Sequence, residues 1–225
     1  MVEEVRNEGC EVLLSYKIHE SYCLDSAQDR LLFYDDFLGD SLRDLWSTTT
    51  AGAGVGGTAV VVDAQDGGVV RLSTTATDGN EIRIDWGDYR SLHVDKNVTI
   101  EVRAKMNDTT DVYYYIGLAF DSNTSVIFYL ANAGNWQNWT RNGGAITTSN
   151  TGVAVDTDYH IFRIECFPTG EVHYYIDGVE TANSPHTTNI PSDAADYLQP
   201  WFRILTSEDD TQSMDIDYVV IRQDR

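Results

Sequence analysis

Hydrophobic and polar residues alternate along most of the chain, and turn residues separate the alternating stretches. Alternation with a period of two is typical of strands that bury one face. The pattern predicts strands at 60–63, 69–73, 81–86, 98–106, 112–120, 125–131, 138–141, 161–167, 171–178, 201–205 and 214–222. No long stretch of helical period lies between them, so the sequence predicts an all-β sandwich or barrel.

Turn chemistry supports this pattern. The clearest hairpin joins residues 161–167 to 171–178 through Thr169-Gly170, and Gly67-Gly68 marks a second turn. The glycine-rich run at 51–57 lacks the Lys-Ser/Thr of a phosphate-binding loop, and no helical pattern follows it. We therefore expect this run to be a loop between strands.

The first 30 residues differ from the rest and predict an N-terminal arm, with the sandwich domain spanning residues 31–225. The arm holds one expected strand, at 11–18, and then a polar stretch at 25–30. Free N-termini usually fray unless something holds them. We therefore expect the arm to contribute a strand or to dock on its own domain or on a neighbouring subunit.

The formal net charge of -21 excludes several partners. Nucleic acids and anionic membranes need a basic face, so neither is expected to bind. The acidic N-terminus has no apolar core of a signal peptide, which predicts synthesis in a cytoplasm. Cys10, Cys23 and Cys166 show no CxxC spacing, so we expect reduced thiols and no zinc site, with pairing of Cys10 and Cys23 left open.

Five short pieces, in this order, resemble the concanavalin A-like lectin/glucanase superfamily. They are Phe33-Tyr34-Asp35-Asp36-Phe37, the strand at 97–106, His160–Glu165, Tyr174-Tyr175-Ile176-Asp177-Gly178 and Ile216-Asp217-Tyr218-Val219. The layout is most similar to laminarinase-like glycoside hydrolases. The resemblance implies a concanavalin A-like β-sandwich, or jelly roll, behind the arm.

The hydrolases of that superfamily carry a Glu-x-Asp-x-x-Glu motif that supplies the nucleophile and the general acid. The equivalent strands here, at 113–120 and 126–130, contain no acidic residue, and the motif occurs nowhere else in the chain. We therefore expect no catalytic residues and no enzymatic activity.

Aromatic residues are the candidates for binding a glycan or a partner protein, because their faces stack on sugars and build interfaces. Alternation places Tyr113 and Tyr115 on one face of their strand and Tyr114 and Ile116 on the other, so one tyrosine set lies outside the core. The candidate ligand-binding residues are Tyr113, Tyr115, Trp136, Trp139 and Trp201. The alternative for each is ordinary packing.

The resemblance also implies a structural calcium ion, held by an opening acidic motif, a glycine carbonyl and the aspartate of the last strand. The matching positions are Asp36, Gly67 or Gly68, and Asp217. The alternative is that both aspartates cap turns, and no cofactor is required.

The missing carboxylates, the arm and the missing signal peptide together predict a non-catalytic virion protein of a tailed phage. Short motifs, from Trp136 through Thr151-Gly152-Val153 to Leu198-Gln199-Pro200, resemble lectin-fold domains of phage structural proteins. The expected role is capsid decoration or tail surface, with glycan adhesion as an added property. The expected partners are other virion proteins such as the major capsid protein, further copies of the chain, and glycans. The alternatives are a carbohydrate-binding module, or a glycoside hydrolase or lyase with a non-standard site.

Overall fold

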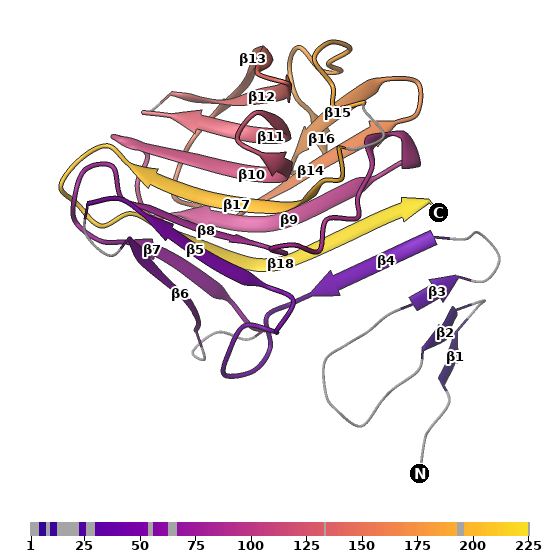
Figure 1. Cartoon of the computed structure of the whole chain (residues 1–225), viewed down its shortest axis with the longest axis horizontal. Coiled ribbons are helices and arrows are strands. Elements are labelled where there is room, and N and C mark those ends of the chain that lie inside the picture. The colour runs from indigo at the N-terminus through magenta and orange to yellow at the C-terminus, as the bar shows by residue number, and fades with distance from the viewer. Residues whose placement is uncertain are drawn as a thin grey trace.

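The computed structural model describes residues 31–53, 56–62, 67–132, 134–192 and 196–224, together with the backbone of 5–7, 10–12, 23–25 and 30. Two antiparallel sheets face each other as a sandwich (Figure 1). The all-β prediction is therefore confirmed, and the architecture is the concanavalin A-like jelly roll.

The seven-stranded sheet has the order β13-β12-β11-β10-β17-β8-β5. Its strands, in chain order, are β5 (Ser47–Ala51), β8 (Glu81–Asp85), β10 (Val112–Asp121), β11 (Thr124–Ala131), β12 (Asn135–Asn142), β13 (Ala145–Ala154) and β17 (Gln199–Thr206).

The eight-stranded sheet has the order β16-β15-β14-β9-β18-β7-β6, and β4 pairs with β18 beside that path. Its strands are β4 (Arg30–Asp35), β6 (Gly57–Val61), β7 (Val70–Thr74), β9 (Thr99–Met106), β14 (His160–Phe167), β15 (Glu171–Ile176), β16 (Val179–Glu180) and β18 (Ser213–Asp224). One short 3₁₀ helix, η1 (Val94–Lys96), precedes β9.

The core forms because alternate residues of both sheets point inward. The β9 strand shows strict alternation of half-buried and buried residues, and Ile82 and Ile84 of β8 are fully buried. Aromatic side chains fill the centre: Phe128 contacts Phe162 and Tyr174 edge to face across the two sheets, with ring centroids 5.3 Å apart in each case.

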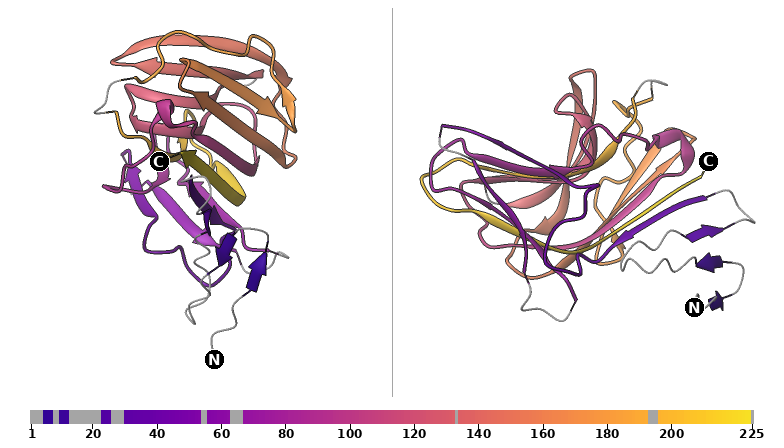
Figure 2. Two further views of the ribbon diagram at one scale, coloured as in Figure 1. Left: turned by 90° about the vertical axis from the view of Figure 1, so that its right-hand side faces the viewer. Right: turned by 60° about the horizontal axis from the view of Figure 1, so that its bottom comes forward.

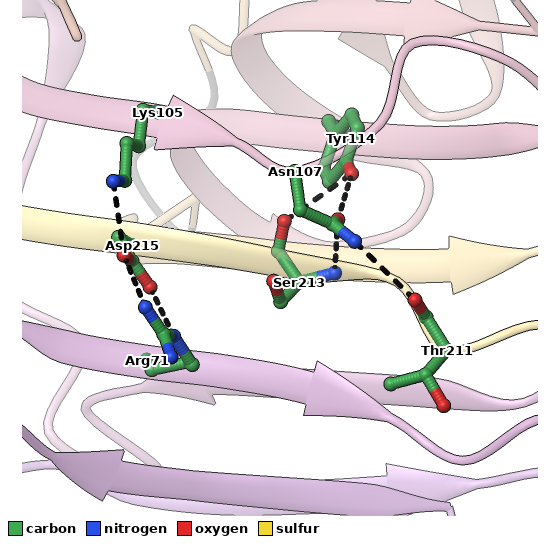
Figure 3. Close-up of polar contacts among 7 residues, drawn as sticks. All are labelled: Arg71, Lys105, Asn107, Tyr114, Thr211, Ser213 and Asp215. Atoms are coloured by element: carbon green, nitrogen blue, oxygen red, sulfur yellow. Dashed lines mark hydrogen bonds and ion pairs between the residues drawn. The ribbon is translucent and has the colours of Figure 1, made fainter. Parts of the chain in front are cut away.

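The last strand, β18, holds the eight-stranded sheet together. It pairs with β9 along one side, and on the other side with β7 up to Ile216 and with β4 from Val219. Polar contacts fasten its first half (Figure 3): Asp215 receives two hydrogen bonds from Arg71, at 2.6 and 2.8 Å, and lies 3.7 Å from the Lys105 ammonium. The Asn107 side-chain oxygen accepts a hydrogen bond from the Ser213 amide at 2.5 Å.

Before β4, three short strands form a small sheet in the order β1-β2-β3. They are β1 (Val5–Asn7), β2 (Cys10–Val12) and β3 (Cys23–Asp25), and Figure 2 shows them beside β4 of the eight-stranded sheet. Of the expected strand at 11–18, only residues 11 and 12 are described, and they belong to β2. The division into an arm at 1–30 and a domain at 31–225 stays a prediction.

Candidate functional site

The outer face of the seven-stranded sheet carries a charged and aromatic surface. On β8 the inward residues are Ile82 and Ile84, so Glu81, Arg83 and Asp85 point outward. Cross-strand pairing then sets Arg83 opposite Arg203 of β17. It also sets Arg203 opposite Tyr115 of β10, and Tyr115 opposite Tyr129 of β11.

This face is hollowed into a groove, which we define by two adjoining hollows of about 450 and 90 Å³. The two hollows share Asp121, Ser122, Trp201 and Arg203. The larger one extends over β8 and β5, and the smaller one reaches Tyr115, Trp139 and Arg141.

Two arginine–carboxylate pairs cross the larger hollow. Arg83 donates from Nε to Asp85 at 2.6 Å, and Arg203 donates from Nη2 to Glu81 at 2.5 Å. Each guanidinium also lies over an aromatic ring: Arg83 is 4.1 Å from the ring centroid of Trp201, and Arg203 is 4.7 Å from that of Tyr115. Trp201 is therefore only 7% exposed, because Arg83 covers one face of its indole.

A row of aromatic rings continues the groove toward β12. Tyr129 lies between Tyr113, at 6.2 Å, and Trp139, at 4.8 Å, and it also contacts Tyr115 at 5.1 Å. Burial raises the pKa values of Tyr115 and Tyr129, so both phenols stay neutral and can donate a hydrogen bond at physiological pH.

The structure brings four of the five predicted ligand residues to this face: Tyr113, Tyr115, Trp139 and Trp201. Trp136, the fifth, does not lie on this face, so its prediction as a ligand-binding residue is wrong. It is 1% exposed and packs edge to face on Phe162 of the opposite sheet, with ring centroids 4.8 Å apart. Residues 136 and 139 lie three apart on one strand, so their side chains point to opposite faces.

Sequence reasoning missed the charged residues of the groove and Tyr129. Glu81, Arg83 and Asp85 repeat at every second position on a strand whose alternation was recognised, and that repeat was the available signal. The contribution of Arg203 depends on the pairing of β8 with β17, which are far apart in the sequence.

The residues predicted to hold calcium also come together, at the point where β18 exchanges β7 for β4. A Cβ on Gly68 would lie 2.5 Å from the Asp36 carbonyl oxygen, and one on Gly67 would lie 3.8 Å from an Asp217 carboxylate oxygen. Burial, followed by the charges of Asp36 and Asp217, raises the pKa of Tyr34 at this place.

These residues offer few oxygen ligands for calcium, which takes six to eight oxygens. Asp217 already forms an ion pair with Arg103, and among the described residues no three acidic, histidine or cysteine side chains are placed to hold a metal ion. Calcium binding at Asp36, Gly68 and Asp217 stays a prediction. Thermal unfolding of the protein with and without added calcium tests it.

Comparison with known proteins agrees with the fold. Residues 65–217 match the family model described as "SO2946-like, C-terminal domain". The fold is that of concanavalin A-like lectins and glucanases. Because the match covers more than half of the chain, the protein belongs to the SO2946-like C-terminal domain family.

Three solved structures illustrate the relationship. The protein of unknown function SO2946 from Shewanella oneidensis MR-1 is 12% identical, with a TM-score of 0.65 over 88% of this chain and 87% of that one. Rv0315 of Mycobacterium tuberculosis, an immunostimulatory antigen and pseudo β-1,3-glucanase, is 19% identical, with a TM-score of 0.60 over 86% and 98%. The catalytic domain of an endo-1,3-β-glucanase (laminarinase) from Thermotoga petrophila RKU-1 is 14% identical, with a TM-score of 0.61 over 88% and 99%.

At these identities the likeness establishes the fold alone. No curated protein sequence matches the chain significantly. In the part of the chain that is described, no helix is long and apolar enough to cross a membrane.

Proposed function

We propose that this protein is a non-catalytic glycan-binding sandwich whose ligand lies in the groove. The observation that carries this proposal is the row of Tyr113, Tyr129 and Trp139 beside the two hollows. Trp139 lines the smaller hollow together with Tyr115, and Tyr113 and Tyr129 extend the row beside it. Aromatic rings offer faces on which sugar rings stack, and neutral phenols offer hydrogen bonds to hydroxyl groups.

The carboxylates of the groove favour binding over hydrolysis. A glycosidase places two carboxyl groups either about 5–5.5 Å or about 6.5–9.5 Å apart, on opposite sides of the scissile bond. Glu81 and Asp85 point to the same face of one strand, so it is their partners rather than their spacing that oppose hydrolysis. Each is held by an arginine, Glu81 by Arg203 and Asp85 by Arg83. The pseudo-glucanase Rv0315 supports the idea that this fold persists without hydrolysis.

Substitution of Trp139 tests the proposal. A glycan array identifies the bound polysaccharide, and Trp139→Ala should lower the affinity for it by at least about ten-fold, since losing a central aromatic anchor typically costs about 2 kcal/mol. Phe167→Ala is the matched control, because Phe167 is an exposed aromatic residue, 37% accessible, on the other sheet. The proposal would be refuted if the protein bound no glycan of the array, or if the two variants bound with equal affinity.

The same preparation tests the absence of catalysis. Incubation of the wild-type protein with the bound polysaccharide should release no reducing ends. Turnover that disappears in Glu81→Gln or Asp85→Asn would show instead an enzyme with a rearranged site.

A role on a phage particle is the second candidate, and the small sheet β1-β2-β3 before β4 favours it. A small sheet beside the last strand of a larger one is suited to pairing with a neighbouring subunit by strand addition. The proposed partners are the major capsid protein or further copies of this chain. A protein that stays monomeric and is absent from purified particles by mass spectrometry would exclude the virion role.

A further inference from the structure

We propose that the groove selects an anionic polysaccharide, whose carboxylate or sulfate groups contact Arg90 and Arg141. This inference rests on the proposed glycan-binding function and adds the charge of the ligand.

One turn of the chain, whose residues line both hollows, contacts both arginines. The Arg90 guanidinium lies 4.5 Å from the ring centroid of Phe120, and Arg141 donates from Nη1 to the Ser122 carbonyl at 2.6 Å. Phe120 and Ser122 flank Asp121, where β10 turns into β11. Arg90 comes from the segment after β8 and Arg141 from β12, so the two cations reach this turn from different strands.

These two guanidinium groups differ from most cations of the protein, because neither has an ion-pair partner among the described residues. Other cationic side chains lie within ion-pair distance of a carboxylate: Arg43, Arg71, Arg83, Arg103, Lys105, Arg163 and Arg203. In a chain of net charge -21, acidic residues are plentiful. Two arginines without a carboxylate partner, beside the turn shared by the two hollows, can therefore bind an anion.

Three of the four carboxylates of the groove already accept hydrogen bonds. Asp85 accepts from Arg83 and from the Gly87 amide at 2.7 Å, Glu81 accepts from Arg203, and Asp121 accepts the Asn123 amide at 2.7 Å. Asp88 is the remaining carboxylate of the lining and is exposed.

Arg90 and Arg141, by contrast, have no carboxylate partner among the described residues, and their guanidinium groups carry more donors than their contacts use. Gln199 Oε1 is a buried acceptor of the lining without a partner among the described residues, but it is a single neutral group. A ligand rich in charged acceptors matches this imbalance, whereas a neutral glycan also needs acceptors for its own hydroxyl groups. Hydrogen bonds between guanidinium and carboxylate or sulfate are also roughly twice as strong as neutral ones.

The net negative charge of the chain opposes a polyanion at long range, and Asp88 opposes it within the groove. At physiological ionic strength such repulsion is screened beyond about 8 Å, whereas contacts inside a groove are screened much less. Binding is therefore measured at physiological salt.

Isothermal titration calorimetry of the full chain with matched polymers tests the inference. Polygalacturonate is compared with its methyl-esterified form, and dextran sulfate with dextran, so that each pair differs in charge on the same backbone. At least one anionic polymer should bind about ten-fold or more tightly than its neutral counterpart, and the pair that discriminates identifies carboxylate or sulfate as the recognised group.

The double variant Arg90→Gln/Arg141→Gln should lose that preference, with affinity falling about ten-fold or more. Lys96→Gln/Arg222→Gln is the control, because it removes the same charge at exposed residues outside the groove and should leave affinity unchanged. An equal loss in both double variants would show an effect of net charge and overturn the inference.

Failure of this inference is distinguishable from failure of the proposed function. If neutral polymers bind as tightly as charged ones, Trp139→Ala abolishes binding and Arg90→Gln/Arg141→Gln does not, the ligand is a neutral glycan and the inference is wrong. If no polymer and no array glycan binds, the glycan-binding function itself is refuted, and the inference falls with it.

Discussion

Replacing Asp35 with alanine is expected to lower the free energy of unfolding by about 3–5 kcal/mol. Asp35 ends β4 and is completely buried. Its carboxylate accepts the Trp46 indole N–H at 2.7 Å and the Phe37 amide at 2.9 Å, and it lies 3.4 Å from the Arg43 guanidinium. Alanine would leave two donors and a partly buried cation unpaired.

Urea denaturation measures this loss, and two further variants separate its causes. Asp40→Ala makes the same change at an exposed position of the following loop and should stay within about 0.5 kcal/mol of the wild type. Asp35→Asn keeps one acceptor oxygen and should lose less than Asp35→Ala. A midpoint for Asp35→Ala equal to that of Asp40→Ala would show that the buried contacts contribute nothing to stability.

Asp35 also explains why the opening signature of the chain is informative about the fold. Its carboxylate fastens the segment after β4 to Trp46, which lies in an aromatic cluster with Phe33, Phe37 and Trp86. The ring centroids of Phe33 and Trp86 are 5.0 Å apart, edge to face. The resemblance was therefore read from residues that build one end of the core, and such residues indicate a scaffold more directly than an activity.

The fold was predictable wherever a strand buries one face. The hairpin of β14 and β15 was placed within two residues because Phe162, Ile164, Val172 and Tyr174 alternate with polar residues and are fully or almost fully buried. The β5 and β13 strands were missed, since both are edge strands whose residues are largely exposed. Ser47–Ala51 carries no hydrophobic alternation, so only pairing with β8 makes it a strand.

The site was predictable only in part, for the same physical reason. Alternation alone indicated that Tyr113 and Tyr115 avoid the face of Tyr114, and the structure agrees. The guanidinium groups that cover Trp201 and Tyr115 depend on the side-by-side placement of β8, β17 and β10. No pattern within one strand carries that information.

The two tryptophans of β12 provide the second large effect. Trp136→Ala should lower the free energy of unfolding by about 3–5 kcal/mol, because it removes a fully buried indole between the sheets and leaves a cavity against Phe162. Trp139→Ala, three residues along the same strand, should lower it by only about 1 kcal/mol, because the half-buried indole lies in the groove.

When both variants are measured by urea unfolding and by glycan binding, each should be impaired in a different property. Trp136→Ala should lose stability and, at temperatures where it remains folded, bind the glycan as the wild type does. Trp139→Ala should keep most of its stability and lose binding. A Trp136→Phe variant, which retains a ring against Phe162, should recover part of the lost stability. If Trp136→Ala remains folded and still loses binding as Trp139→Ala does, the two faces of β12 are coupled, and the separation of core from groove on which the proposed function depends would be wrong.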